Sequence, residues 1–117
     1  MIRTISQQEL VERLEGEQPR NDQRSGGYAL VNVLDHDAFA KAHIPGSVNI
    51  PAGHEEAFKE RYDTSKEIIL YCSSASCPAS PRVARVLEAQ GFGHVEHYRA
   101  GLEGWAESGY ALESGTA

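Results

Sequence analysis

Two cysteines, Cys72 and Cys77, lie in the stretch YCSSASCPASP, which covers residues 71–81. Cys72 directly follows the apolar segment 68–71, and the residues between the two cysteines are all small. Small residues let the backbone curl so that several N–H groups point inward, and such a nest favours a thiolate or an anion bound to its sulfur. The setting therefore predicts a nucleophilic Cys72 with a pKa below the usual ~8.5. The alternative is an inert thiol buried at a strand end.

The elements expected around this loop alternate between strands and helices. Ser6 and Glu9 form a Ser-x-x-Glu capping box before apolar residues at helical spacing, which predicts a helix up to about Gly16. Continuous apolar runs are typical of strands that are buried on both faces of a parallel sheet. We expect five strands, at residues 4–5, 28–34, 48–50, 67–72 and 94–98. Three other helices are expected around Phe39, over 54–62 and over 101–109. A further helix is expected to begin with Ser80 as its cap and Pro81 in its first position, and to end at Gly91.

This alternation predicts a three-layer α/β domain in which helices flank a five-stranded, mostly parallel sheet. We expect a single domain over residues 1–113 and a frayed tail over 114–117. The polar, glycine-rich stretch 16–27 is interpreted as a surface loop within that domain. Sites in such sheets lie beyond the carboxyl ends of the strands, and Cys72 stands at one of these ends. Its position is thus a second reason to expect a site there.

Composition and charge exclude several classes of protein. A chain of 117 residues with 40% hydrophobic and 24% charged residues can fold as one globular domain without a disulfide or a metal. No apolar stretch approaches the ~20 residues of a membrane span, and the N-terminal residues lack the pattern of a signal peptide. We therefore expect a monomer with free thiols in the reducing cytoplasm. The net charge of −6 and the scattered Lys and Arg predict neither a nucleic-acid partner nor a membrane partner. They are compatible with a basic protein as a partner.

Three stretches resemble, in this order, the signatures of a single-domain rhodanese, or sulfurtransferase. They are LVNVLDHDAFAKAHIPGSVNIP, IILYCSSASC and ARVLEAQGFGHVEHYRAGLEGWAESGY, and the resemblance covers residues 3–113. It implies that Cys72 takes a sulfane sulfur from thiosulfate or a low-molecular-weight persulfide and becomes a persulfide. The sulfur then passes to cyanide, a thiol or a partner protein, without a cofactor. The residues implied to cradle the persulfide with their backbone N–H groups are Ser73, Ser74, Ala75, Ser76 and Cys77.

The chain departs from the pattern of this family at two places. The usual Asp-x-Arg after the first long strand is Asn-Val-Leu at residues 32–34, so an acidic residue and its cationic companion are absent. The cysteine loop is about two residues longer than in sulfurtransferases, and Pro78 stands where the related phosphatase and arsenate-reductase branch carries an arginine. Without that guanidinium, phosphoryl transfer is disfavoured. Arg82, in the next helix, is the candidate for positive charge on the substrate side.

Cys77 adds a second thiol to the loop. If the loop curls, Cys77 can attack a Cys72 persulfide, which releases sulfide and leaves a disulfide, or it can receive the sulfur itself. The alternative is that Cys77 packs beneath Pro78, because the spacing i, i+5 does not ensure the Cα separation that a disulfide needs.

Three functions are compatible with these residues. The leading hypothesis is a sulfurtransferase that works through a Cys72 persulfide. The second is a thiol-disulfide switch or reductase that uses Cys72 and Cys77, and the third is a non-catalytic rhodanese-like interaction module, which the missing Asp-x-Arg pair favours. A zinc site that includes His94 and His97 is disfavoured because a strand places these side chains on opposite faces, so we expect no metal.

Overall fold

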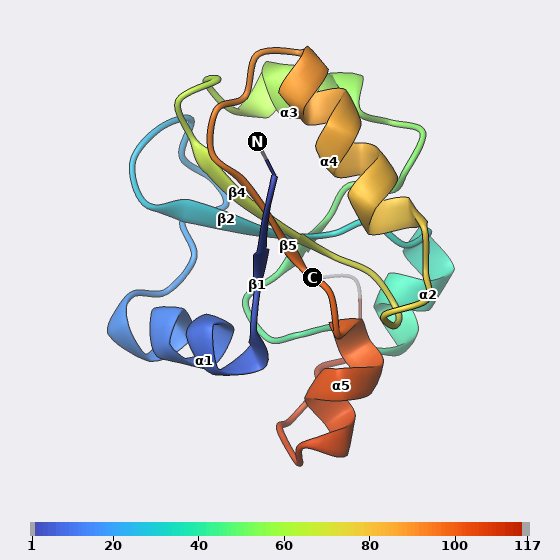
Figure 1. Cartoon of the computed structure of the whole chain (residues 1–117). Helices are drawn as coiled ribbons and strands as arrows, with labels where there is room; N and C mark the ends of the chain where they lie inside the picture. Colours follow the sequence, from blue (N-terminus) through green and yellow to red (C-terminus); the bar gives the residue numbers. More distant parts are fainter. Residues whose placement is uncertain (1, 116–117) are drawn as a thin grey trace.

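Five strands form one sheet in the computed structural model, which describes residues 2–115 (Figure 1). Their order is β1-β5-β4-β2-β3, with bounds β1 Arg3–Ile5, β2 Tyr28–Asn32, β3 Val48–Asn49, β4 Glu67–Tyr71 and β5 Val95–Tyr98. Neighbouring strands all pair in parallel within the described chain, so the sheet expected to be mostly parallel is wholly so. β4 lies at the centre of the sheet, and Cys72 is the first residue beyond its carboxyl end.

Helices cover both faces of this sheet. Their bounds are α1 Gln7–Gly16, α2 His36–Lys41, α3 Glu56–Arg61, α4 Ala79–Ala89 and α5 Gly101–Glu107. Figure 1 shows α1 and α5 on one side of the sheet and α3 and α4 on the other. The three-layer α/β architecture expected from the sequence is therefore confirmed.

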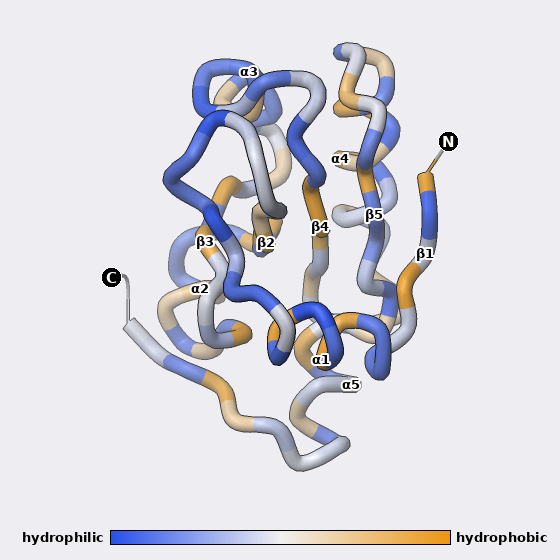
Figure 2. Tube along the Cα trace, turned by 90° about the vertical axis from the view of Figure 1, so that its left-hand side faces the viewer, coloured by the Kyte–Doolittle hydropathy of each residue, from blue (hydrophilic) through white to orange (hydrophobic). Residues whose placement is uncertain are grey.

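The central strand is buried on both faces, which explains its continuous apolar sequence. Ile68, Leu70 and Cys72 belong to the core cluster that contains residues of α3 and α4. Ile69 and Tyr71 belong to the cluster that contains residues of α1 and α5. Successive side chains of a strand point to opposite faces, so this alternation is what a covered parallel strand requires. Figure 2 shows β2 and β4 as hydrophobic stretches in the middle of the molecule.

Local signals determine where α1 begins, but not where α4 begins. The Ser6 hydroxyl accepts a hydrogen bond from the Glu9 N–H at 3.1 Å, and the Glu9 carboxylate accepts one from the Ser6 N–H at 3.0 Å, so the capping box is confirmed. The expected Ser80 cap is wrong, because α4 begins at Ala79 with Pro78 in the cap position. Ser80 is then buried in the first turn, and its hydroxyl has no hydrogen-bond partner among the described residues.

Hydrogen bonds from buried side chains hold the glycine-rich stretch 16–27, which we expected to be a surface loop, against the core. Lys66 is only 1% exposed, and its ammonium group donates to the carbonyl oxygens of Arg20 at 2.8 Å and Gly26 at 2.6 Å. The Tyr62 hydroxyl donates to the Asn21 carbonyl at 2.6 Å. These bonds satisfy loop carbonyls that would otherwise be left without partners, and they order a segment that has no secondary structure of its own.

The end of the chain crosses back to the residues after α2. His43 and Glu113 exchange two backbone hydrogen bonds, both of 2.9 Å, and the Gly115 N–H donates to the Ala40 carbonyl at 2.7 Å. The tail that we expected to be frayed covers residues 114–117. Glu113 precedes this tail and Gly115 lies within it, whereas residues 116–117 lie outside the described residues. Between residues 2 and 115, the helices are too short or too polar for any of them to cross a membrane.

Candidate active site

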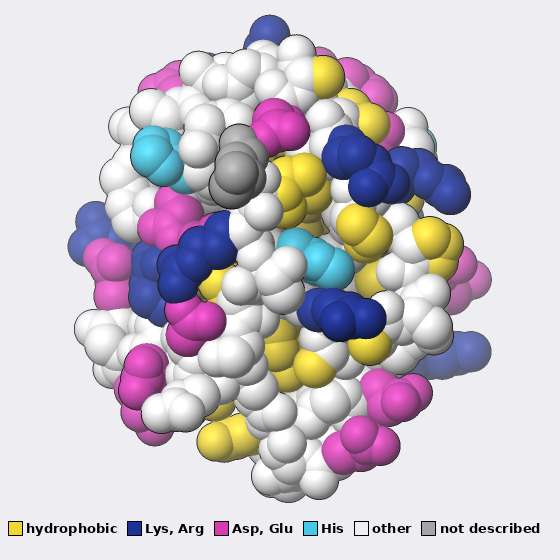
Figure 3. Space-filling model, in the orientation of Figure 1, with side chains coloured by type: hydrophobic (Ala, Val, Ile, Leu, Met, Phe, Trp, Pro, Cys, Tyr) yellow, Lys and Arg dark blue, Asp and Glu magenta, His cyan; other side chains and the backbone are white. Residues whose placement is uncertain are grey.

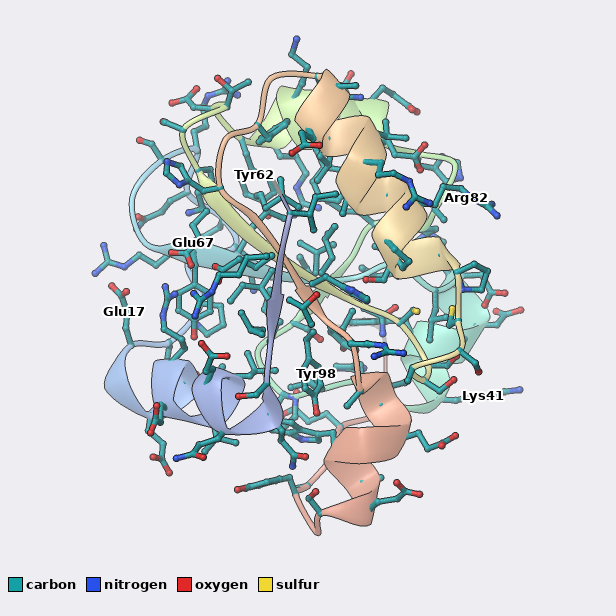
Figure 4. The ribbon with its side chains drawn as sticks, viewed as in Figure 1. Glu17, Lys41, Tyr62, Glu67, Arg82 and Tyr98 are labelled. Atoms are coloured by element: carbon teal, nitrogen blue, oxygen red, sulfur yellow. The ribbon has the colours of Figure 1, made fainter. Side chains whose placement is uncertain are left out.

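Cys72 lies at the carboxyl edge of the sheet, where the central strand leaves the core. Its side chain is only 1% exposed, and its Sγ lies 3.7 Å from the Cys77 carbonyl oxygen, to which it donates a weak hydrogen bond. In Figure 4 the sulfur atoms lie in the loop between β4 and α4. The structure therefore brings together the two cysteines of the predicted site. Cys72 lies on the inner side of the loop, and Cys77 is partly exposed.

The start of α5 holds the first half of this loop. The N–H groups of Leu102 and Glu103 donate to the carbonyls of Cys72 at 3.0 Å and Ser73 at 2.8 Å. Gly101 makes this approach possible, because its φ is +64° and a Cβ atom there would lie 2.5 Å from the Cys72 carbonyl oxygen. The sequence includes Gly101 in a family motif, but no local pattern indicates that its backbone touches a residue so far away along the chain.

Tyr71 connects the end of β4 to the turn that contains Pro45. Its hydroxyl accepts a hydrogen bond from the Ile44 N–H at 3.0 Å and lies 2.7 Å from the Ser47 hydroxyl. His43 stabilises the same segment, since its Nδ1 lies 2.8 Å from the Phe39 carbonyl oxygen. The backbone partner of the His43 side chain belongs to α2 and not to the turn. These contacts position the residue that precedes Cys72, a role that the sequence did not reveal.

The second half of the loop curls back through a turn. The Cys77 N–H donates to the Ser74 carbonyl at 3.2 Å, and the hydroxyls of Ser74 and Ser76 lie 3.1 Å apart. Ser73, Ala75 and Ser76 are exposed, whereas Ser74 and Cys77 are partly buried. The turn therefore places the Cys77 thiol next to that of Cys72, as the curled loop in our expectation requires.

The pKa values of the two thiols shift in opposite directions, although burial raises both. Burial first, and then contact with the Cys77 thiol, raises the pKa of Cys72 to about 11, although the N–H groups of Ser80 and Ser73 oppose this shift. Burial also opposes ionisation of Cys77, but hydrogen bonds from the Cys72 thiol and from the N–H groups of Ala79 and Ser73 outweigh it and lower its pKa. The expected lowering at Cys72 is therefore wrong for the free protein. The backbone N–H groups of the loop act on both sulfurs, and ionisation is favoured more at Cys77, the outer of the two, than at Cys72.

The positive charge expected on the substrate side belongs to an exposed residue of α4. Arg82 is exposed on the first turn of α4, as Figure 4 shows, and its guanidinium makes no hydrogen bond or ion pair with any described residue. Asn32, at the position of the family's acidic residue, is fully buried, and its Oδ1 accepts a hydrogen bond from the Leu34 N–H at 2.8 Å. A neutral amide bonded in this way needs no cationic companion.

Charges are mixed on the face of the molecule that Figure 3 shows, and the histidines of residues 2–115 form no metal site. Figure 3 shows acidic and basic side chains interspersed on one face of the molecule. His94 precedes β5, and His97 lies within that strand opposite Leu70. Among residues 2–115, no group of three His, Cys, Asp or Glu side chains could hold a metal ion.

Proteins of known sequence resemble this chain over most of its length. The family described as rhodanese-like domain matches residues 6–108. The putative sulfur carrier protein YrkF of Bacillus subtilis is 33% identical over 76 residues, which are 65% of this chain and 40% of the relative. The HTH-type transcriptional regulator Rv0324 of Mycobacterium tuberculosis is 28% identical over 91 residues, 78% of this chain and 40% of the relative. The thiosulfate:glutathione sulfurtransferase of Saccharomyces cerevisiae is 26% identical over 93 residues, 68% of this chain and 66% of the relative.

The chain thus spans two fifths of the first two relatives and about two thirds of the third. Solved structures share its fold. The BH2092 protein from Bacillus halodurans has a TM-score of 0.81 and 26% identity, covering 97% of this chain and 77% of the other. The human single-domain sulfurtransferase TSTD1 has a TM-score of 0.72 and 19% identity, covering 89% of this chain and 95% of the other.

Proposed function

The chain belongs to the rhodanese-like domain family, and on this premise we propose that it is a sulfurtransferase that carries sulfane sulfur as a persulfide on Cys72. The position of Cys72 carries the proposal, because this thiol directly follows the carboxyl end of the central strand, where the backbone N–H groups of Ser80 and Ser73 favour its anion. The relatives named as a sulfur carrier and as a sulfurtransferase support the same chemistry. Free thiols of this kind require a reducing compartment such as the cytoplasm.

The reaction has two steps. The Cys72 thiol, whose pKa is raised by burial, first loses its proton to solvent. The resulting thiolate attacks the outer sulfur of the donor, so that a new S–S bond forms on Cys72 while the donor's own S–S bond breaks. Thiosulfate leaves as sulfite, and a low-molecular-weight persulfide leaves as its thiolate. An acceptor such as cyanide, a thiol or a partner protein then attacks the outer sulfur of the Cys72 persulfide and regenerates the Cys72 thiolate. Backbone N–H groups that point at the sulfur stabilise the anion in both steps.

The loop favours one class of donor. Its side chains between Cys72 and Pro78 carry no positive charge, and Arg82 is exposed on the helix that follows. Thiosulfate is a small dianion, and its binding depends on a nearby cation. A sulfane sulfur attached to a thiol brings less charge into the loop. We therefore propose that the protein exchanges sulfur with thiol persulfides more readily than with thiosulfate.

Intact-mass analysis under non-reducing conditions tests the proposal. The protein is mixed with either donor, and its thiols are blocked within seconds so that short-lived forms are retained. We expect one added sulfur per chain on the peptide that contains Cys72, and none in Cys72→Ser. Circular dichroism and the urea midpoint of the variant serve to check that it is folded.

Two results would contradict the proposal. Equal uptake of sulfur by Cys72→Ser would assign the carrier to another residue. The absence of uptake by the wild-type protein from either donor would favour the non-catalytic interaction module.

A further inference from the structure

Cys77 is the reactive group in this loop that carrying sulfur on Cys72 does not require. The turn that starts at Ser74 directs Cys77 back over Cys72, so that the Cys77 carbonyl oxygen lies 3.7 Å from the Cys72 Sγ. Cys77 is partly exposed whereas Cys72 is buried. The N–H groups of Ala79 and Ser73 favour a thiolate on Cys77, whose pKa is lowered although burial opposes this. An activated thiol therefore lies beside the sulfur that would carry the persulfide.

The two halves of the loop are held differently. Hydrogen bonds from α5 reach the carbonyls of Cys72 and Ser73, and Gly101 lies against the backbone of this half of the loop. Within the described chain, no hydrogen bond joins residues 75–77 to α5. A displacement that brings the Cys77 sulfur onto the Cys72 sulfur therefore involves only the outer half of the loop. A fixed electrophilic sulfur with a movable thiolate beside it is the arrangement that disulfide formation requires.

We propose that Cys77 is a resolving thiol that converts the Cys72 persulfide into sulfide, so that the protein reduces sulfane sulfur at the expense of external thiols; this inference rests on the proposed function. The Cys77 thiolate attacks the inner sulfur of the protonated persulfide. The Cys72–Cys77 disulfide bond forms, the bond to the outer sulfur breaks, and that sulfur leaves as HS⁻. Two external thiols then reduce the disulfide, become a disulfide themselves and restore both cysteines, so atoms and electrons balance.

The internal thiol has an advantage over external acceptors. A group attached to the same short loop acts at an effective concentration on the order of millimolar or higher, whatever the concentration of external thiols. Sulfide release therefore dominates when no acceptor is bound. An acceptor that enters the loop before Cys77 reaches the inner sulfur takes the outer sulfur instead.

A single-turnover experiment tests this inference. Wild-type protein and Cys77→Ser are loaded with a low-molecular-weight persulfide, separated from the donor, and incubated without any thiol. Intact mass follows the persulfide and the disulfide, and a colorimetric assay follows free sulfide. We expect the wild-type protein to release its sulfur as sulfide and to become a disulfide, whereas the Cys77→Ser persulfide lasts at least about tenfold longer. Cys77→Ala should behave like Cys77→Ser, which separates loss of the thiol from any effect of the new hydroxyl.

The outcomes distinguish this inference from the proposed function. If the wild-type and Cys77→Ser persulfides are equally long-lived and release no sulfide, the resolving role is wrong and the sulfur-carrying role of Cys72 stands. If Cys77→Ser takes up no sulfur while it is folded, or if Cys72→Ser takes up and releases sulfur like the wild-type protein, the assignment of Cys72 as the carrier is wrong.

Discussion

Replacing Gly101 with alanine tests whether α5 holds the Cys72 loop in its working position. The added Cβ would lie 2.5 Å from the Cys72 carbonyl oxygen and 2.9 Å from the Ser74 nitrogen. These atoms belong to the backbone, so no side-chain rotation can relieve the contact. The loop and α5 must move apart, which lengthens the two hydrogen bonds that α5 donates to the carbonyls of Cys72 and Ser73.

The magnitude follows from two contributions. An alanine in the left-handed conformation that Gly101 adopts, with φ of +64°, costs about 1 kcal/mol. Each of the two hydrogen bonds contributes about 0.5–1.5 kcal/mol to stability. We therefore expect Gly101→Ala to lower the free energy of unfolding by about 2–4 kcal/mol. Sulfur uptake by Cys72 should also slow in the folded fraction, because the N–H groups that surround the sulfur lose their alignment.

Gly109→Ala is the matched control. Gly109 also has a positive φ, +87°, but a Cβ atom there would meet nothing within 4 Å. It should lower stability by about 1 kcal/mol through the backbone conformation alone and leave sulfur uptake unchanged. Urea unfolding measures the stability of both variants, and mass spectrometry at early times measures the rate of sulfur uptake. Equal losses of stability in the two variants, with equal uptake rates, would refute the role that we assign to Gly101.

Two further predictions concern buried charged groups. Lys66→Met removes the charged donor to two loop carbonyls, so we expect the free energy of unfolding measured in urea to fall by about 1.5–3 kcal/mol. The control Lys59→Met, at an exposed position, should change this free energy by less than about 0.5 kcal/mol. A loss for Lys66→Met no larger than that of the control would contradict the role of the loop bonds. Burial, and then the neighbouring Glu67 carboxylate, raises the pKa of Glu96 from 4.5 to about 7. Between these two pH values the folded protein keeps a proton that the unfolded chain has lost, so stability should fall as pH rises from about 4.5 to about 7 and level off above that. Glu96→Gln should lose this decline, whereas the exposed Glu60→Gln should keep it; unchanged pH dependence in Glu96→Gln would rule out this source.

The order of the elements could be predicted because each one has a local signal. Apolar runs predicted the strands, the Ser6 capping box predicted the start of α1, and Gly91, with φ of +103°, ends α4 as expected. The start of α4 could not be predicted in the same way. Ser80 and Pro81 form a good local cap, but the turn that returns Cys77 to Cys72 runs directly into the helix, which therefore begins at Ala79. Tertiary placement of the loop outweighed a capping preference of about 1 kcal/mol.

The sequence by itself determined that Cys72 stands at the carboxyl end of a buried strand, in a loop of small residues with a second thiol, because strand and loop patterns depend on neighbouring residues. Only the tertiary structure decided how the site is held and in which direction the pKa of each thiol shifts. Gly101 and Tyr71 support the loop through partners that are distant along the chain. The pKa of Cys72 depends on its depth below the surface and on where Cys77 lies, and both follow from the packing of α4 and α5 around the loop. Burial and electrostatic interactions act through space, so residue order alone does not determine them.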